Sequence, residues 1–125
     1  MDWVVQVGLA ELALGGLLGW AMVVREEKPD WLTRIGVVAP HRIRQLHIDY
    51  VMMGLILIGV GLAVPDLPTV AAAVLVFGTL VNPFLFVPLA FHPGADKKLW
   101  YRALATVSFF AVSGGLVVAA IVGPA

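Results

Sequence analysis

The chain has 125 residues, of which 61% are hydrophobic and 13% are charged, and its basic and acidic residues balance to zero net charge. Soluble domains contain about 45–50% apolar and about 25% charged residues, so a chain this apolar could not cover itself with polar surface in water. A soluble enzyme, a disordered chain and a nucleic-acid-binding protein are therefore excluded. The sequence has no cysteine, which excludes a disulfide framework, a thiol nucleophile, a zinc finger and an iron–sulfur cluster.

Four stretches are long enough to cross a lipid bilayer as helices, which takes about 20 apolar residues each. They cover residues 3–24, 47–64, 69–91 and 99–122. The segment from Pro40 to Gln45 is compatible with an earlier start of the second helix, because proline is tolerated at the first helical position. We therefore expect one all-α domain over residues 1–125, an integral membrane four-helix transmembrane bundle.

The basic residues indicate how the bundle is oriented. All eight lysines and arginines lie in or beside the segments that connect spans one and two and spans three and four. Both segments fall on the same side of a four-span bundle, and the positive-inside rule places that side in the cytoplasm. We expect segments 25–46 and 92–98 to be cytoplasmic and both termini to lie outside, in the cytoplasmic membrane of a bacterium.

A few polar residues lie within the predicted spans, where ionisable groups are costly and usually face the bundle interior or a cavity. Glu11 lies near the middle of the first span, His47 and Asp49 open the second, and Asn82 precedes Pro83 in the third. A carboxyl group as deep as that of Glu11 must be protonated or have a partner such as Asn82 or a histidine. The chain has no Ser/His/Asp arrangement, HExxH motif or glycine-rich phosphate loop, so hydrolase, zinc-protease and nucleotide-binding functions lack support.

His47 allows three interpretations. It could bond a lipid headgroup or a carbonyl at the interface, bind a metal or haem iron as a neutral imidazole, or relay protons with Asp49 and Glu11. His47, Val51 and Gly54 share one helix face, and Gly54 would leave room there for a flat ligand such as a porphyrin, although close helix packing explains this glycine equally well. Asp49 points about 200° away from His47, and we expect it to pair with a basic side chain.

Two short stretches resemble known membrane enzymes. The run HIDYVMMG from His47 to Gly54, followed by an apolar helix that ends at Pro65, resembles the opening of the second helix in hydroxylaminobenzene mutases. The run FGTLVN over residues 77–82 is similar to a motif in their third helix. The membrane-bound styrene oxide isomerases are similar in the same helix pair and share the positions of His47, Gly54 and Asn82. The first and fourth spans agree with these families in topology only.

The resemblance implies a four-helix subunit that assembles into a homotrimer, with haem b near the subunit contacts. It implies that His47 is the axial iron ligand, with Val51 and Gly54 on its helix face beside the cofactor, and that Asn82 borders a pocket for a small lipophilic aromatic substrate. In the isomerases ferric haem acts as a Lewis acid on an epoxide, which rearranges to an aldehyde. The mutases move the hydroxyl group of an arylhydroxylamine from nitrogen to a ring carbon. Both reactions need an iron that polarises oxygen and a dry pocket.

Three positions depart from the pattern of these families. Met53 stands where an asparagine is expected, Phe86 where the isomerases have a tyrosine, and Gly78 where they have an aspartate. We expect these three residues to border the substrate pocket, with Asn82 orienting the substrate and Glu11 supplying the missing polar group. The alternative functions are a haem-carrying electron-transfer or sensor subunit without isomerase activity, and a cofactor-free structural bundle.

Overall fold

The computed structural model describes residues 2–125, and this part of the chain is helical with no strand. Four helical segments are long and apolar enough to cross a membrane, which confirms the expected four-helix architecture. They are α1 (Asp2–Glu27), α3 (His41–Ala63), the pair α4 (Thr69–Phe84) and α5 (Phe86–Phe91), and α6 (Leu99–Val122). The second span begins at His41, directly after Pro40, as the earlier of the two expected starts requires.

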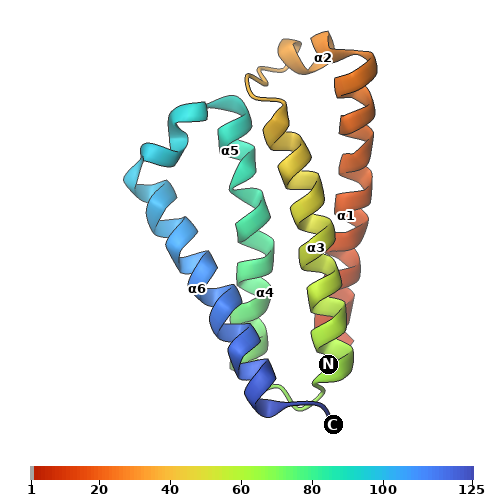
Figure 1. Ribbon diagram of the computed structural model, residues 1–125, viewed down its shortest axis with the longest axis vertical. Coiled ribbons are helices and arrows are strands. Elements are labelled where there is room, and N and C mark those ends of the chain that lie inside the picture. Colours follow the sequence, from red (N-terminus) through yellow and green to blue (C-terminus); the bar gives the residue numbers. More distant parts are fainter. Residues whose placement is uncertain (1) are drawn as a thin grey trace.

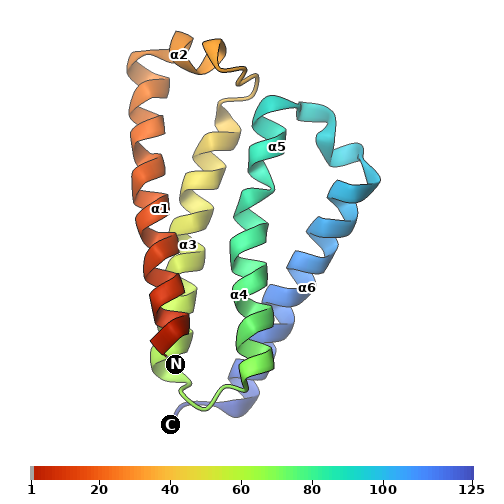
Figure 2. The same cartoon turned by 180° about the vertical axis from the view of Figure 1, so that it is seen from behind.

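The helices are arranged as two packed pairs (Figure 1). Helix α1 packs along α3, helix α4 packs on α6, and the contact of α3 with α4 and α5 joins the pairs. Helix α6 meets α4 near the end of the bundle where the chain termini lie and diverges from it toward the opposite end, as both views show (Figures 1 and 2). Where they diverge, apolar side chains of the third span, of the segment that connects it to α6 and of α6 itself pack between them, among them Leu85, Leu89, Ala95 and Tyr101.

The two connections that carry the basic residues lie at the same end of the bundle. One contains the short helix α2 (Pro29–Arg34), and the other contains the 3₁₀ helix η1 (Pro93–Lys97). The turn over residues 64–68 and both ends of the described chain lie at the opposite end (Figures 1 and 2). This arrangement agrees with the predicted topology, and the end that faces the cytoplasm stays a prediction.

Two prolines interrupt the third span. Pro83 and Pro88 have no backbone N–H to donate, and the helix is broken at Leu85, between α4 and α5. Two tyrosines form hydrogen bonds near this break. The hydroxyl of Tyr50 in α3 donates to the carbonyl oxygen of Leu80 (2.9 Å), and the hydroxyl of Tyr101 in α6 donates to the carbonyl oxygen of Leu85 (2.9 Å). The hydroxyl groups thus tie α3 and α6 to the third span at the level of the break.

Glycines let α1 and α3 approach each other closely. A methyl group added at Gly54 would lie 2.7 Å from the carbonyl oxygen of Gly8 and 2.7 Å from the amide nitrogen of Leu12. A methyl group at Gly15 would lie 2.7 Å from the Cγ2 atom of Val51. Small residues allow such backbone contacts in membranes, where lipid provides no hydrophobic drive for helices to associate.

Candidate functional site

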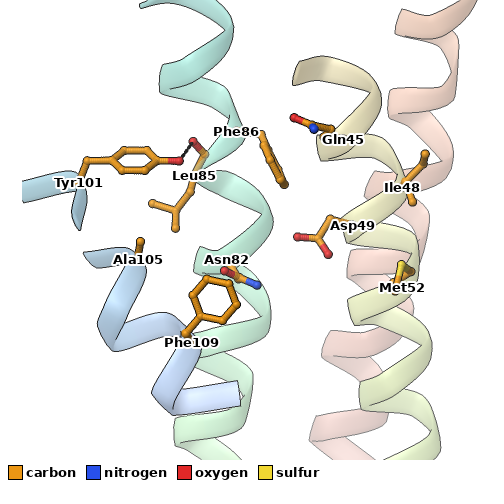
Figure 3. Close-up of a pocket in the computed structure, with 10 residues that line it drawn as sticks. All are labelled: Gln45, Ile48, Asp49, Met52, Asn82, Leu85, Phe86, Tyr101, Ala105 and Phe109. Carbon is orange, nitrogen blue, oxygen red and sulfur yellow. Dashed lines mark hydrogen bonds between the residues drawn. The ribbon is translucent and has the colours of Figure 1, made fainter. Parts of the chain in front are cut away.

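Polar side chains of three elements meet in a pocket between α3, the α4–α5 span and α6 (Figure 3). Its volume is about 570 Å³, within the range of about 300–1,000 Å³ that is typical of small-molecule sites. The residues that line it are Gln45, Ile48, Asp49, Met52, Asn82, Leu85, Phe86, Tyr101, Ala105 and Phe109. Most of this lining is apolar or aromatic, with a few polar groups among it, as in other ligand sites.

The polar groups of the pocket come mainly from α3 and α4. The carboxylate of Asp49 and the carboxamide of Asn82 point toward each other across it (Figure 3). Asn82 Oδ1 accepts a hydrogen bond from the hydroxyl of Ser108 (3.3 Å), which leaves the amide hydrogens of Asn82 for a ligand. Within residues 2–125 Asp49 forms no hydrogen bond or ion pair, and the one salt bridge there joins Arg34 to Asp30 (3.5 Å). The expected pairing of Asp49 with a basic side chain is therefore wrong for this chain.

Only one of the three residues that we expected to border the substrate pocket lines this one. Phe86 does, whereas Met53 is turned into the helix packing with 8% of its surface exposed, and its neighbour Met52 lines the pocket instead. Gly78 faces α6, where an added methyl group would lie 2.8 Å from the amide nitrogen of Val112. Contrary to expectation, Met53 is buried and Gly78 lets α4 approach α6 closely, because the rotation of each helix turns these residues away from the pocket.

His47 lies on a different face of α3, against α1. Its ring nitrogen Nδ1 donates a hydrogen bond to the carbonyl oxygen of Gly15 (2.5 Å). The ring also faces Gly19, where an added methyl group would lie 3.3 Å from Cε1. Because a carbonyl oxygen can only accept, Nδ1 carries the hydrogen and Nε2 of the neutral ring keeps a free lone pair. Histidines that bind metals use this arrangement, with one nitrogen donating to a carbonyl and the other binding the metal.

The structure does not bring His47 and Asn82 together within one chain. His47 is not among the residues that line the Asn82 pocket. The space that we expected beside Gly54 is filled by the backbone of α1, and Val51 packs on Gly15. Gly54 and Val51 therefore take part in close packing of α1 against α3, which is the second of the two interpretations of this glycine. That they lie beside a cofactor stays a prediction.

Glu11 is buried where α1 meets α4, away from the Asn82 pocket. Its side chain is 2% exposed, and its Oε2 accepts a hydrogen bond from the hydroxyl of the fully buried Thr79 (3.1 Å). Its Oε1 is buried without a hydrogen-bond partner among residues 2–125. The expected partners, Asn82 or a histidine, are thus replaced by Thr79. Sequence reasoning missed Thr79 because a buried threonine can instead satisfy its hydroxyl within its own helix. The structure contains that bond as well, from the Thr79 hydroxyl to the Val76 carbonyl oxygen (3.0 Å).

In comparisons with known proteins, no family model, no curated protein and no solved structure matches the chain.

Proposed function

We propose that the protein is a membrane-bound, haem b-dependent isomerase or mutase that rearranges a small lipophilic aromatic epoxide or arylhydroxylamine. The observation that carries this proposal is the hydrogen bond from His47 Nδ1 to the Gly15 carbonyl, which orients the imidazole and leaves Nε2 as a ligand. When bound, ferric haem would supply a Lewis acid that polarises the substrate oxygen. The resemblance at His47, Gly54 and Asn82 supports the same cofactor and class of reaction.

In this proposal a second copy of the chain completes the site. His47 and the Asn82 pocket lie on different faces of α3, and the half-buried His47 ring keeps part of its surface open. A homotrimer, which the resemblance implies, would place the His47 face of one subunit beside the Asn82 pocket of its neighbour. The cofactor would then lie at the subunit contact, and neither face would be complete alone.

The residues of the Asn82 pocket suit a rearrangement that passes through a substrate cation. The amide of Asn82 can donate a hydrogen bond to the substrate oxygen and orient it. The aromatic faces of Phe86 and Phe109 stabilise positive charge, and the apolar lining keeps out water that would add to the cation. With an epoxide, the benzylic C–O bond breaks, a hydride moves to the benzylic carbon from its neighbour, and a C=O bond forms. Atoms and electrons balance without a co-reactant.

The first test is an absorption spectrum of the detergent-purified protein, reconstituted with haemin. We expect a haem Soret band that the His47→Ala variant loses or shifts, because the axial ligand is removed. His41→Ala, an exposed histidine at the start of α3, is the matched control and should leave the band unchanged. A protein without a Soret band would contradict the proposed cofactor, and a saturated low-spin iron that does not take up azide would contradict isomerase activity and favour electron transfer.

The second test asks whether the site is shared between subunits. We expect His47→Ala and Asn82→Ala each to abolish conversion of styrene oxide to phenylacetaldehyde and of phenylhydroxylamine to aminophenol. Co-expression of the two variants in equal amounts should restore about a quarter of the wild-type activity. In a cyclic oligomer with random mixing, that is the share of subunit contacts that join an intact His47 to an intact Asn82. If mixed oligomers stay inactive while the wild type is active, the site lies within one chain.

A further inference from the structure

We propose that the pocket between α3, α4 and α6 binds a small lipophilic organic cation, whose charge is neutralised by Asp49. This inference goes beyond the proposed isomerase reaction, which makes no use of Asp49, and it requires neither His47 nor a cofactor. If both proposals hold, the cation competes with the substrate for the space beside Asn82. Three features of the pocket support it: the Asp49 carboxylate, aromatic walls and an opening toward the lipid.

The carboxylate of Asp49, which has no hydrogen-bond or ion-pair partner among residues 2–125, is the first feature. Asp49 lies eight residues into α3, about 12 Å along the helix, and it is half-buried. Charged groups within spans are usually paired, because a lone charge is costly there. Arg42 donates instead to Gln45 Oε1 (2.9 Å), and Arg102 donates to the carbonyl oxygen of Asp96 (3.4 Å). Neither arginine pairs with Asp49, so a positively charged ligand would supply the missing partner.

The second feature is the wall around this carboxylate. Phe86 and Phe109 present aromatic rings to the same pocket, and Met52 adds a polarisable side chain (Figure 3). Aromatic faces attract organic cations, most strongly where water is absent. The amide hydrogens of Asn82 face the Asp49 carboxylate but cannot neutralise it. The pocket therefore combines one carboxyl group, which a cationic ligand would hold in its charged form, with an apolar body, and this fits a ligand with a positive head and a hydrocarbon or aryl tail.

The third feature is access from the bilayer. Residues of α3 and of α6 line the pocket on the two sides of the α4–α5 span (Figure 3). Met52 on α3 is 52% exposed and Phe109 on α6 is 62% exposed, so both rims of the pocket face outward. A lipophilic cation that partitions into the membrane can reach this open side from the bilayer or, in the proposed oligomer, along the subunit contact, without passing through the helix bundle.

Binding of a matched pair of probes tests the inference. The cation is (4-phenylbutyl)trimethylammonium, whose nitrogen has no lone pair and cannot bind iron, and the neutral probe replaces that nitrogen with carbon. Isothermal titration of the protein in lipid nanodiscs should show the cation binding at least about tenfold more tightly than the neutral probe. Asp49→Asn should weaken binding of the cation about tenfold and leave binding of the neutral probe unchanged. Asp66→Asn, which removes the same charge from the exposed 64–68 turn, should change neither.

A second variant keeps the test decisive if Asp49→Asn does not fold. Ala105→Phe fills the pocket from α6 while Asp49 stays in place, and it should abolish binding of both probes. Equal binding of the two probes to the wild type, or full binding of the cation to Asp49→Asn, would overturn the inference. Because the cationic probe cannot bind iron, its binding does not depend on whether the protein contains haem. A colourless protein that binds the cation refutes the proposed function alone, and a haem protein that does not bind it refutes only this inference.

Discussion

Replacing Gly54 with alanine should destabilise the protein by about 1–3 kcal/mol, even though alanine is the better helix former. The added methyl group would lie 2.7 Å from the carbonyl oxygen of Gly8 and from the amide nitrogen of Leu12. Both are backbone atoms, which cannot rotate out of the way as a flexible side chain would. Helix α1 must therefore move away from α3. The hydrogen bond between His47 and the Gly15 carbonyl joins the same two helices, so this movement also acts on it.

The free energy of unfolding in an SDS titration measures this effect, and α3 itself contains the control. Gly59 lies five residues further along α3 with no atom within 4 Å of an added methyl group. Gly59→Ala should be neutral or should stabilise the protein by up to about 1 kcal/mol, because only helix propensity changes. If the two alanine variants are equally stable, α1 and α3 do not pack as closely as the structure shows.

Replacing Glu11 with alanine is the second change with a large expected effect, about 2–4 kcal/mol of lost stability. The variant removes a side chain that is 2% exposed and the hydrogen bond that joins α1 to Thr79 of α4. Glu11→Gln should stay within about 1 kcal/mol of the wild type, because an ionised carboxylate without a cationic partner would be far more costly at this depth than the neutral acid. Glutamine has the size of that acid and can also donate a hydrogen bond.

The contacts of Thr79 agree with an uncharged Glu11. The Thr79 hydroxyl lies 3.1 Å from Glu11 Oε2 and 3.0 Å from the Val76 carbonyl, and its single hydrogen serves only one of them at a time. A protonated Glu11 can donate the second bond itself. Unfolding titrations of both variants test this, with Glu26→Ala at the exposed end of α1 as a control that should change stability by less than about 0.5 kcal/mol. A Gln variant as unstable as the Ala variant would contradict the neutral, hydrogen-bonded Glu11 inferred from these contacts.

The candidate site was less accessible to sequence reasoning than the spans were. Asn82 and Phe86 could be placed at a pocket because a short motif and the adjacent Pro83 singled out that part of the third span. Met52 and Met53 are both apolar neighbours in the same run, and nothing in the sequence shows that only Met52 faces the pocket. Periodicity gives the angle between residues on one helix, but the rotation of that helix against its neighbours depends on packing.

The sequence by itself determined that this is a membrane protein with four spans and its basic residues at one end. Length, hydropathy and charge decide those features, because the thickness of the bilayer sets the length of each helix and its apolar interior disfavours charged residues within the spans. Only the tertiary structure decided that His47 faces α1 while Asp49 and Asn82 share a pocket, and that Thr79 is the partner of Glu11. These contacts depend on how closely glycines let particular helices approach, and such interhelical distances are properties of the packed bundle rather than of any one segment.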